Sequence, residues 1–179
     1  MVAKSLVKLI DEAIVPAVIL IIAKMAGLLV SAYFFNFKYE VVFGGAFNVL
    51  PKVVFANLPN YVIAENYSNL AMFLTAATGT LIVLMRAHFL HETHVTPQTQ
   101  QKLASLNLEN LILSSFHLYH IATIWLIFLW LTTGFLIAST ISGVTYPQIT
   151  VIALIVAANF TWIFAMDVQK EMEISRWQV

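Results

Sequence analysis

The sequence contains no cysteine and carries little charge. Only 10 % of its 179 residues are Asp, Glu, Lys or Arg, whereas a soluble domain has about 25 %. Without cysteine the chain has no disulfide, no thiolate metal site and no cysteine nucleophile. Nine basic residues are balanced by nine acidic ones, so the basic surplus of a nucleic-acid-binding protein is missing and we expect no nucleic-acid partner. Hydrophobic residues make up 60 % of the chain, more than a soluble fold of this size can cover with polar surface.

Four stretches are apolar enough to cross a bilayer, which takes about 20 residues because the hydrocarbon core is roughly 30 Å thick. The last two come from one run without charge, Asn110–Met166, which divides at a turn rich in Ser, Thr, Gly and Pro at 139–148. We place the spans at 13–35, 69–90, 114–138 and 149–166. The sequence therefore predicts an all-α integral membrane protein, a single domain over residues 1–179 built as a bundle of four transmembrane helices in a lipid bilayer.

The basic residues are distributed unevenly between the two ends of these spans. Six of them fall on one side, namely Lys4, Lys8, Arg86, Lys102, Lys170 and Arg176. The other side has Lys38 and Lys52. Because cytoplasmic segments carry the excess of Lys and Arg, we expect both termini to face the cytoplasm.

Two connections between spans have a pattern of their own. The segment Asn36–Ser68 is long and hydrophobic, but its uncharged runs are too short to cross a membrane and contain Pro51 and Pro59. We expect a long external loop there, with interfacial or re-entrant segments. In the connection on the other side, Thr96-Pro97 predicts a short helix with a Thr cap and Pro in its first turn, a helix that continues toward the third span.

Lys24 lies near the middle of the first predicted span, where a lysine is costly. Gly27 and Ser31 lie on the same face of this predicted helix as Lys24. The stripe of small residues Ala23-Gly27-Ser31 is typical of a helix that packs against another helix. Lys24 is therefore expected to face protein, with Asn159 of the fourth span at a similar depth as a hydrogen-bond acceptor. The functional interpretation is a proton, anion or ligand site. The alternative is a structural hydrogen bond or a side chain that reaches the interface.

All five histidines fall within one part of the sequence: His88, His91, His94, His117 and His120. Residues three apart on a helix are neighbours, and antiparallel packing of the second and third spans brings His88/His91 and His117/His120 to comparable depth. Charged residues border the same region: Arg86, Glu92, Glu109 and Asp167.

Several chemistries fit such a convergence of histidines. Haem b takes one His from each of two facing helices, and a transition metal such as zinc, iron or copper takes several imidazoles with Glu92 or Glu109. A pH-sensitive gate uses imidazoles without an ion. Histidines at the interface with their nitrogens in water are the plain structural alternative.

Three functions remain open. The first is a small, non-enzymatic subunit of an oligomeric membrane assembly, a pore or a component of a larger complex, made of copies of itself or of other membrane subunits. Stripes of small residues on the second and fourth spans, Ala71-Thr75-Gly79 and Ala153-Ala157-Thr161-Ala165, favour it. The second is a haem- or metal-binding oxidoreductase subunit that uses the histidines. The third is a small transporter or sensor built around Lys24.

Overall fold

The computed structural model describes residues 2–44, 51–89, 95–107 and 115–177. Its elements, in chain order, are α1 (Val2–Phe34), β1 (Tyr39–Phe43), β2 (Pro51–Phe55), α2 (Leu58–Phe89), α3 (Pro97–Ser105), α4 (Ser115–Ile141) and α5 (Pro147–Trp177). Four of the helices contain a stretch long and apolar enough to cross a membrane: Ile10–Phe34, Leu58–Phe89, His117–Ile141 and Pro147–Glu173. The predicted all-α bundle with four long apolar helices is thus confirmed.

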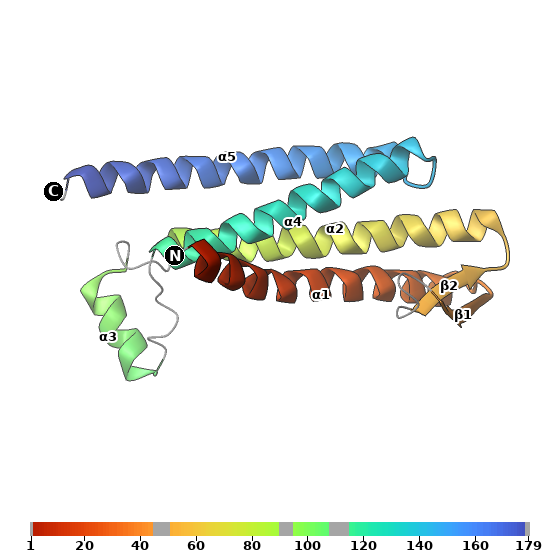
Figure 1. The fold of residues 1–179 in the computed structure, drawn as a ribbon, viewed down its shortest axis with the longest axis horizontal. Helices are drawn as coiled ribbons and strands as arrows, with labels where there is room; N and C mark the ends of the chain where they lie inside the picture. The colour runs from red at the N-terminus through yellow and green to blue at the C-terminus, as the bar shows by residue number, and fades with distance from the viewer. Residues whose placement is uncertain (1, 45–50, 90–94, 108–114, 178–179) are drawn as a thin grey trace.

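The long helices lie side by side, with α2 and α4 in the middle of the bundle. Both α1 and α5 contact this central pair, from opposite sides (Figure 1). We call the end of the bundle that holds the β-hairpin and the α4–α5 turn the hairpin end. The opposite end, where α1 begins and α5 finishes, is the terminal end, and α3 lies beside it (Figure 1).

The second long helix begins well before the predicted span at 69. Asn57 caps it, because its Oδ1 accepts from the backbone N–H of Asn60 at 2.9 Å, and Pro59 stands in the first turn, where a missing N–H costs nothing. The predicted loop Asn36–Ser68 is therefore too long by more than two helical turns. Its remaining part contains an antiparallel hairpin in which Tyr39 pairs with Phe55.

The short helix expected at Thr96-Pro97 is confirmed, and Thr96 Oγ1 accepts from the N–H of Thr99 at 3.4 Å. This helix ends at Ser105. Leu106 is its C-cap, and Asn107 follows with φ of 55°, a left-handed conformation that stops a helix. The prediction that it continues toward the third span is therefore wrong.

Small residues let the helices approach closely, as the stripes predict. A Cβ added at Gly27 of α1 would lie 2.7 Å from Ser68 Cα of α2. A Cβ at Gly79 of α2 would lie 2.0 Å from the indole of Trp125 of α4. On α5, Ala153 and Ala157 are fully buried. Gly27, Gly79, Ala153 and Ala157 thus pack helices within one chain, whereas Thr161 and Ala165 of the last stripe are exposed.

The centre of the bundle is apolar. A buried cluster joins all four long helices: Leu20, Phe73, Ala76, Leu126, Leu129, Leu136, Ala153 and Ala157. The outward faces are apolar as well, with large side chains such as Ile22, Val30 and Ile155 more than half exposed on the isolated chain. Apolar residues on both the inside and the outside are what a bundle surrounded by lipid requires.

Candidate polar sites at the two ends of the bundle

Lys24 is the centre of a polar site in the hairpin-end half of the bundle. Its Nζ donates to Glu65 Oε1 at 2.5 Å and to Asn69 Oδ1 at 2.7 Å. The ammonium also lies 4.8 Å from the ring centroid of Phe135, within the range of a cation–π contact. The ammonium thus has two hydrogen-bond acceptors and an aromatic face as its neighbours. Lys24 therefore faces protein, and its charge is compensated by a carboxylate on the neighbouring helix.

Asn159 is not the partner of Lys24, contrary to the interpretation of the sequence. Its amide donates to the carbonyl of Ile155 in its own helix at 2.7 Å, and its side chain is exposed on α5. The arrangement of helices explains the difference. Lys24 packs against α2 and α4, whereas α5 lies on the far side of that pair (Figure 1).

The same face of α2 holds the turn between α4 and α5. Asn66 Nδ2 donates to the carbonyl of Val144 at 2.6 Å, and the N–H of Tyr146 donates to Asn66 Oδ1 at 2.7 Å. Asn69 Nδ2 donates to Thr145 Oγ1 at 2.8 Å. A single amide thus satisfies two partly buried backbone groups of the turn.

The buried amide of Asn66 has a second consequence, because Asn66-Tyr67-Ser68 matches the sequon for N-glycosylation. Asn66 is 2 % exposed and Ser68 is fully buried. The hydroxyl of Ser68 donates to the carbonyl of Lys24 at 2.6 Å. In the folded chain this sequon is a packing element between helices.

Glu65 and Asn69 could not be identified from the sequence alone. Glu65 lies in the predicted loop before the second span, and Asn69 is the first residue of that span, so hydropathy gives neither a partner. The one available signal was Lys24 itself, since a lysine inside an apolar span implies an acidic or amide partner. Helical spacing then places Glu65 and Asn69 on one face, four residues apart.

The terminal end carries two further polar clusters, in each of which a carboxylate of an outer helix meets imidazoles of the central pair. On α5, Asp167 Oδ1 lies 2.9 Å from His88 Nδ1 of α2, and Asp167 Oδ2 accepts from the hydroxyl of Tyr119 of α4 at 3.1 Å. On α1, Glu12 Oε2 lies 3.2 Å from His120 Nε2, and Glu12 Oε1 lies 3.8 Å from His117 Nδ1. Each outer helix thus presents one carboxylate to imidazoles of the central pair.

The described histidines are therefore divided between two carboxylates. His117 and His120 meet on one face of α4 at Glu12, whereas His88 meets Asp167 on the other side of the bundle. Within the ranges that the structure describes, no three His, Asp or Glu side chains are arranged to hold a metal ion. Arg86 lies half-buried in the last helical turns of α2. Four of the residues singled out in the sequence lie outside the described residues: His91, Glu92, His94 and Glu109.

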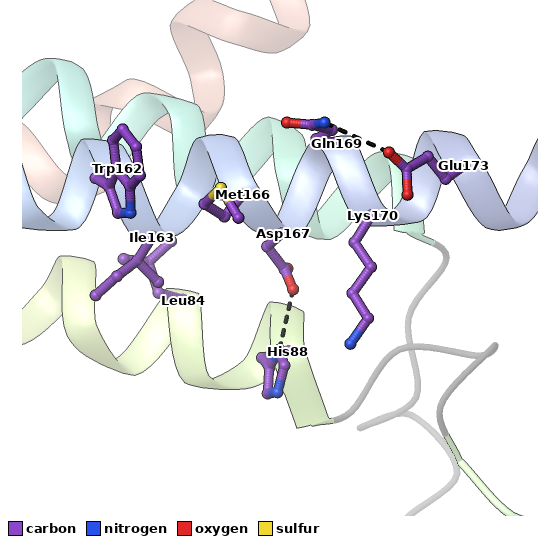
Figure 2. A pocket seen from close by; sticks show the side chains of 9 residues that line it. All are labelled: Leu84, His88, Trp162, Ile163, Met166, Asp167, Gln169, Lys170 and Glu173. Carbon is purple, nitrogen blue, oxygen red and sulfur yellow. Dashed lines mark hydrogen bonds and ion pairs between the residues drawn. The ribbon is translucent and has the colours of Figure 1, made fainter.

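An open groove of about 500 Å³ runs between α2 and α5 at the terminal end. Figure 2 shows Asp167 and Lys170 of α5 directed toward α2, where His88 lies. Apolar side chains form one part of the groove: Leu84, Trp162, Ile163 and Met166. Polar side chains form the other: His88, Asp167, Gln169, Lys170 and Glu173. The groove thus changes from apolar to charged along the axis of α5.

No protein-family model, no curated protein and no solved structure matches the chain.

Proposed function

We propose that this chain is a multi-pass membrane protein that acts as a small subunit of an oligomeric assembly, and that copies of it associate through α5. Four helices long and apolar enough to span a bilayer support the membrane location. The excess of basic residues near the terminal end supports a topology in which both termini and α3 face the cytoplasm and the hairpin end is external.

The observation that carries the oligomer is Asn159. It stands near the centre of the apolar stretch Pro147–Glu173 and is exposed, on the side of α5 that turns away from the bundle. Its amide donates one hydrogen bond, to Ile155 of its own helix. A polar side chain directed at the hydrocarbon core favours association with another polar group. An Asn amide has donors and acceptors and is complementary to itself, so a second copy of α5 is the simplest partner.

The packing of the bundle favours a path between chains over a path through one chain. Its centre is filled by side chains such as Phe73, Leu129 and Leu136, which are at most 2 % exposed. These apolar residues separate the polar site at Lys24 from the carboxylate–imidazole contacts at Glu12 and Asp167. A conduction pathway for ions or solutes in such an assembly is therefore formed between subunits, and each chain lines part of it.

The ionic side chains of the bundle support a structural role in such a subunit. Lys24 is held by Glu65 and Asn69, and the described histidines are held by carboxylates of the outer helices. Each of these contacts ties an outer helix to the central pair. A bundle stabilised by its own polar contacts presents a defined outer surface to its neighbours.

The proposal is tested by the mass of the purified protein in detergent, measured by light scattering for the parent and for Asn159→Leu. The parent is expected to be larger than one chain. Loss of an interhelical Asn contact weakens association by about 1–2 kcal/mol, which is about tenfold. Thr123→Val is the matched control, because the hydroxyl of Thr123 is also exposed and donates to its own helix.

Single cysteines add a geometric test, since the chain has none of its own. Ile155→Cys lies one turn from Asn159 on α5, and Ile127→Cys is similarly exposed on α4. Oxidation is expected to link copies through position 155 and to leave position 127 unlinked. A monomeric parent, or equal linking at both positions, would contradict the proposal.

A further inference from the structure

We propose that the β-hairpin lies in the interfacial region of the external leaflet, with the apolar side chains of β1 turned toward lipid. The inference rests on the membrane location proposed above, but it does not depend on the oligomer. Three observations carry it: the exposed apolar face of β1, the open backbone edge of the hairpin and the tyrosines at the same end of the bundle.

Aromatic rings attach the hairpin to the helices through β2. The ring of Phe55 lies 6.4 Å from the ring of Phe37 and 6.4 Å from the ring of Tyr61, which belongs to the first turns of α2. β2 also contacts α2, and Val53 in this strand is 8 % exposed. β2 is therefore the inner strand of the hairpin, and β1 is the outer one.

β1 is exposed along its whole length, although its sequence is mostly apolar. Successive side chains of a strand point to opposite faces, so Tyr39, Val41 and Phe43 share one face, and Phe43 is 81 % exposed. The residues of β2 that pair with them are apolar as well. The opposite face carries the charges of Glu40 and Lys52. An exposed face of this kind is unfavourable in water and suits the lipid side of an interface.

The backbone edge of β1 sets the depth of the hairpin. In the part of the chain that the structure describes, the sheet consists of β1 and β2, so the outer edge of β1 has no neighbouring strand. Unpaired N–H and C=O groups at such an edge need water or lipid head groups, and open sheet edges do not occur within the hydrocarbon core. A re-entrant placement is therefore unfavourable. The interface meets both requirements, because apolar side chains reach lipid there while the edge stays hydrated.

Tyrosines mark the level of the interface at this end of the bundle. The side chain has an apolar ring and a polar hydroxyl, and tyrosine is enriched where a bilayer meets water. All tyrosines of the chain except Tyr119 lie at the hairpin end and are exposed on the isolated chain: Tyr33, Tyr39, Tyr61, Tyr67 and Tyr146. Along the bundle axis the hairpin lies level with the α4–α5 turn, which ends at Tyr146 (Figure 1). The hairpin and these tyrosines thus share one level of the membrane.

Charged residues in and near β1 favour lipid over a second copy as the occupant of this surface. An open edge can pair with a strand of another chain, and natural proteins prevent such pairing with short edge strands and with charged side chains, lysine above all. β1 has 5 residues and contains Glu40, and Lys38 stands just before it. Lys38 and Lys52 are exposed, and a lysine with an apolar stem and a charged head suits the boundary between acyl chains and phosphates. A lipid surface therefore matches both the apolar and the cationic groups of the hairpin.

The experiment measures depth with a nitroxide spin label on single cysteines, since the chain has no cysteine of its own. The full-length protein is placed in phosphatidylcholine vesicles. Collisions of each label with dioxygen, which concentrates in lipid, are compared with its collisions with a water-soluble nickel chelate. Ile127→Cys, exposed near the middle of the apolar stretch of α4, is the hydrocarbon reference. Gln98→Cys, exposed on α3, is the aqueous reference.

We expect the dioxygen-to-nickel ratio of Val41→Cys to lie between the two references and severalfold above the ratio of Gln98→Cys. Glu40→Cys is the matched control, because position 40 lies one residue away on the opposite face of the same strand. Its ratio is expected to be lower than that of Val41→Cys. If Val41→Cys does not fold, Phe43→Cys lies on the same face and carries the same expectation.

Every other result overturns the proposal. A ratio at position 41 equal to the aqueous reference would place the hairpin in water, and a ratio equal to the hydrocarbon reference would place it in the core. Equal ratios at positions 40 and 41 would mean that neither face is turned toward lipid. Spin–spin broadening at position 41 that disappears on dilution with unlabelled chains would identify a second copy on β1. If the label at position 127 itself reports water, the membrane location fails as well, whereas a monomeric mass with the expected depths refutes the oligomer alone.

Discussion

Removing one member of the Lys24–Glu65 pair is expected to destabilise the folded bundle strongly. In Glu65→Leu, the ammonium of Lys24 keeps Asn69 and the ring of Phe135 but loses its anion. Breaking a buried pair on one side costs about 3–5 kcal/mol. The side chains of Lys24 and Glu65 are 26 % and 11 % exposed, so the pair is not fully buried and we expect about 3 kcal/mol.

Lys24→Leu separates insertion from folding. Replacing a lysine near the centre of a span by leucine eases insertion of that helix by about 3 kcal/mol. The same change leaves the carboxylate of Glu65 between α1 and α2 without its cation, so the folded bundle is expected to lose about 3 kcal/mol. One substitution thus makes the first helix a better membrane span and the protein less stable.

The double variant Lys24→Leu/Glu65→Leu decides between pairing and independent effects. When both charges are replaced by apolar residues of similar volume, the cost of stripping them of water also disappears. We expect the double variant to lie within about 1 kcal/mol of the parent, so that the coupling in the double-mutant cycle is several kcal/mol.

The assay is equilibrium unfolding of the purified protein in mixed micelles, followed by tryptophan fluorescence, since Trp125 packs on Gly79 between α2 and α4. Thr75→Val is the control on α2, because the hydroxyl of Thr75 donates to its own helix at 2.8 Å. If the two single substitutions simply add in the double variant, the pair does not act as a unit and the reasoning is refuted.

Three further predictions concern topology, packing and the sequon. A single cysteine at Gln98 is expected to stay unlabelled by an impermeant reagent in intact cells; labelling would reverse the proposed topology. Gly27→Val is expected to destabilise by about 1–3 kcal/mol because its Cβ would meet Ser68 Cα at 2.7 Å. Gly134→Val, with nothing within 4 Å of its Cβ, is the control, and equal losses would refute the contact. Asn66→Ala is expected to cost about 1–3 kcal/mol, since it leaves two backbone groups of the α4–α5 turn unpaired; unchanged thermal stability would show that the turn does not depend on Asn66.

The number of long helices could be predicted from the sequence, but the start of α2 could not. Hydropathy measures transfer of a side chain into lipid. Glu65, Asn66 and Asn69 score as loop residues on such a scale, yet they are 8 % exposed or less because other parts of the chain provide their partners. A hydropathy scale treats each residue alone, so it does not predict the burial of polar residues whose partners lie on other helices.

The depth of the histidines follows from the sequence, but their rotation about the helix axes does not. Spacing of three residues places His117 and His120 on one face of α4, and both meet Glu12. Which faces of α2 and α4 confront each other depends on packing, and His88 meets α5 instead. Glu12 itself lies one residue before the first predicted span, where hydropathy gives no sign that it faces the histidines of α4.

The contacts of Asn66 with the α4–α5 turn impose an order on the biogenesis of the protein. Their partners, Val144 and Tyr146, follow 78 and 80 residues later in the chain. During synthesis the N-terminal turns of α2 therefore enter the membrane before these two partners exist, when the amide of Asn66 has the carbonyl of Val62 in its own helix. The partner of Glu65 is already present when Glu65 is synthesised, because Lys24 precedes it by 41 residues. The α1–α2 pair can thus form first as it leaves the ribosome, with the amide of Asn66 as the docking point for the later helices.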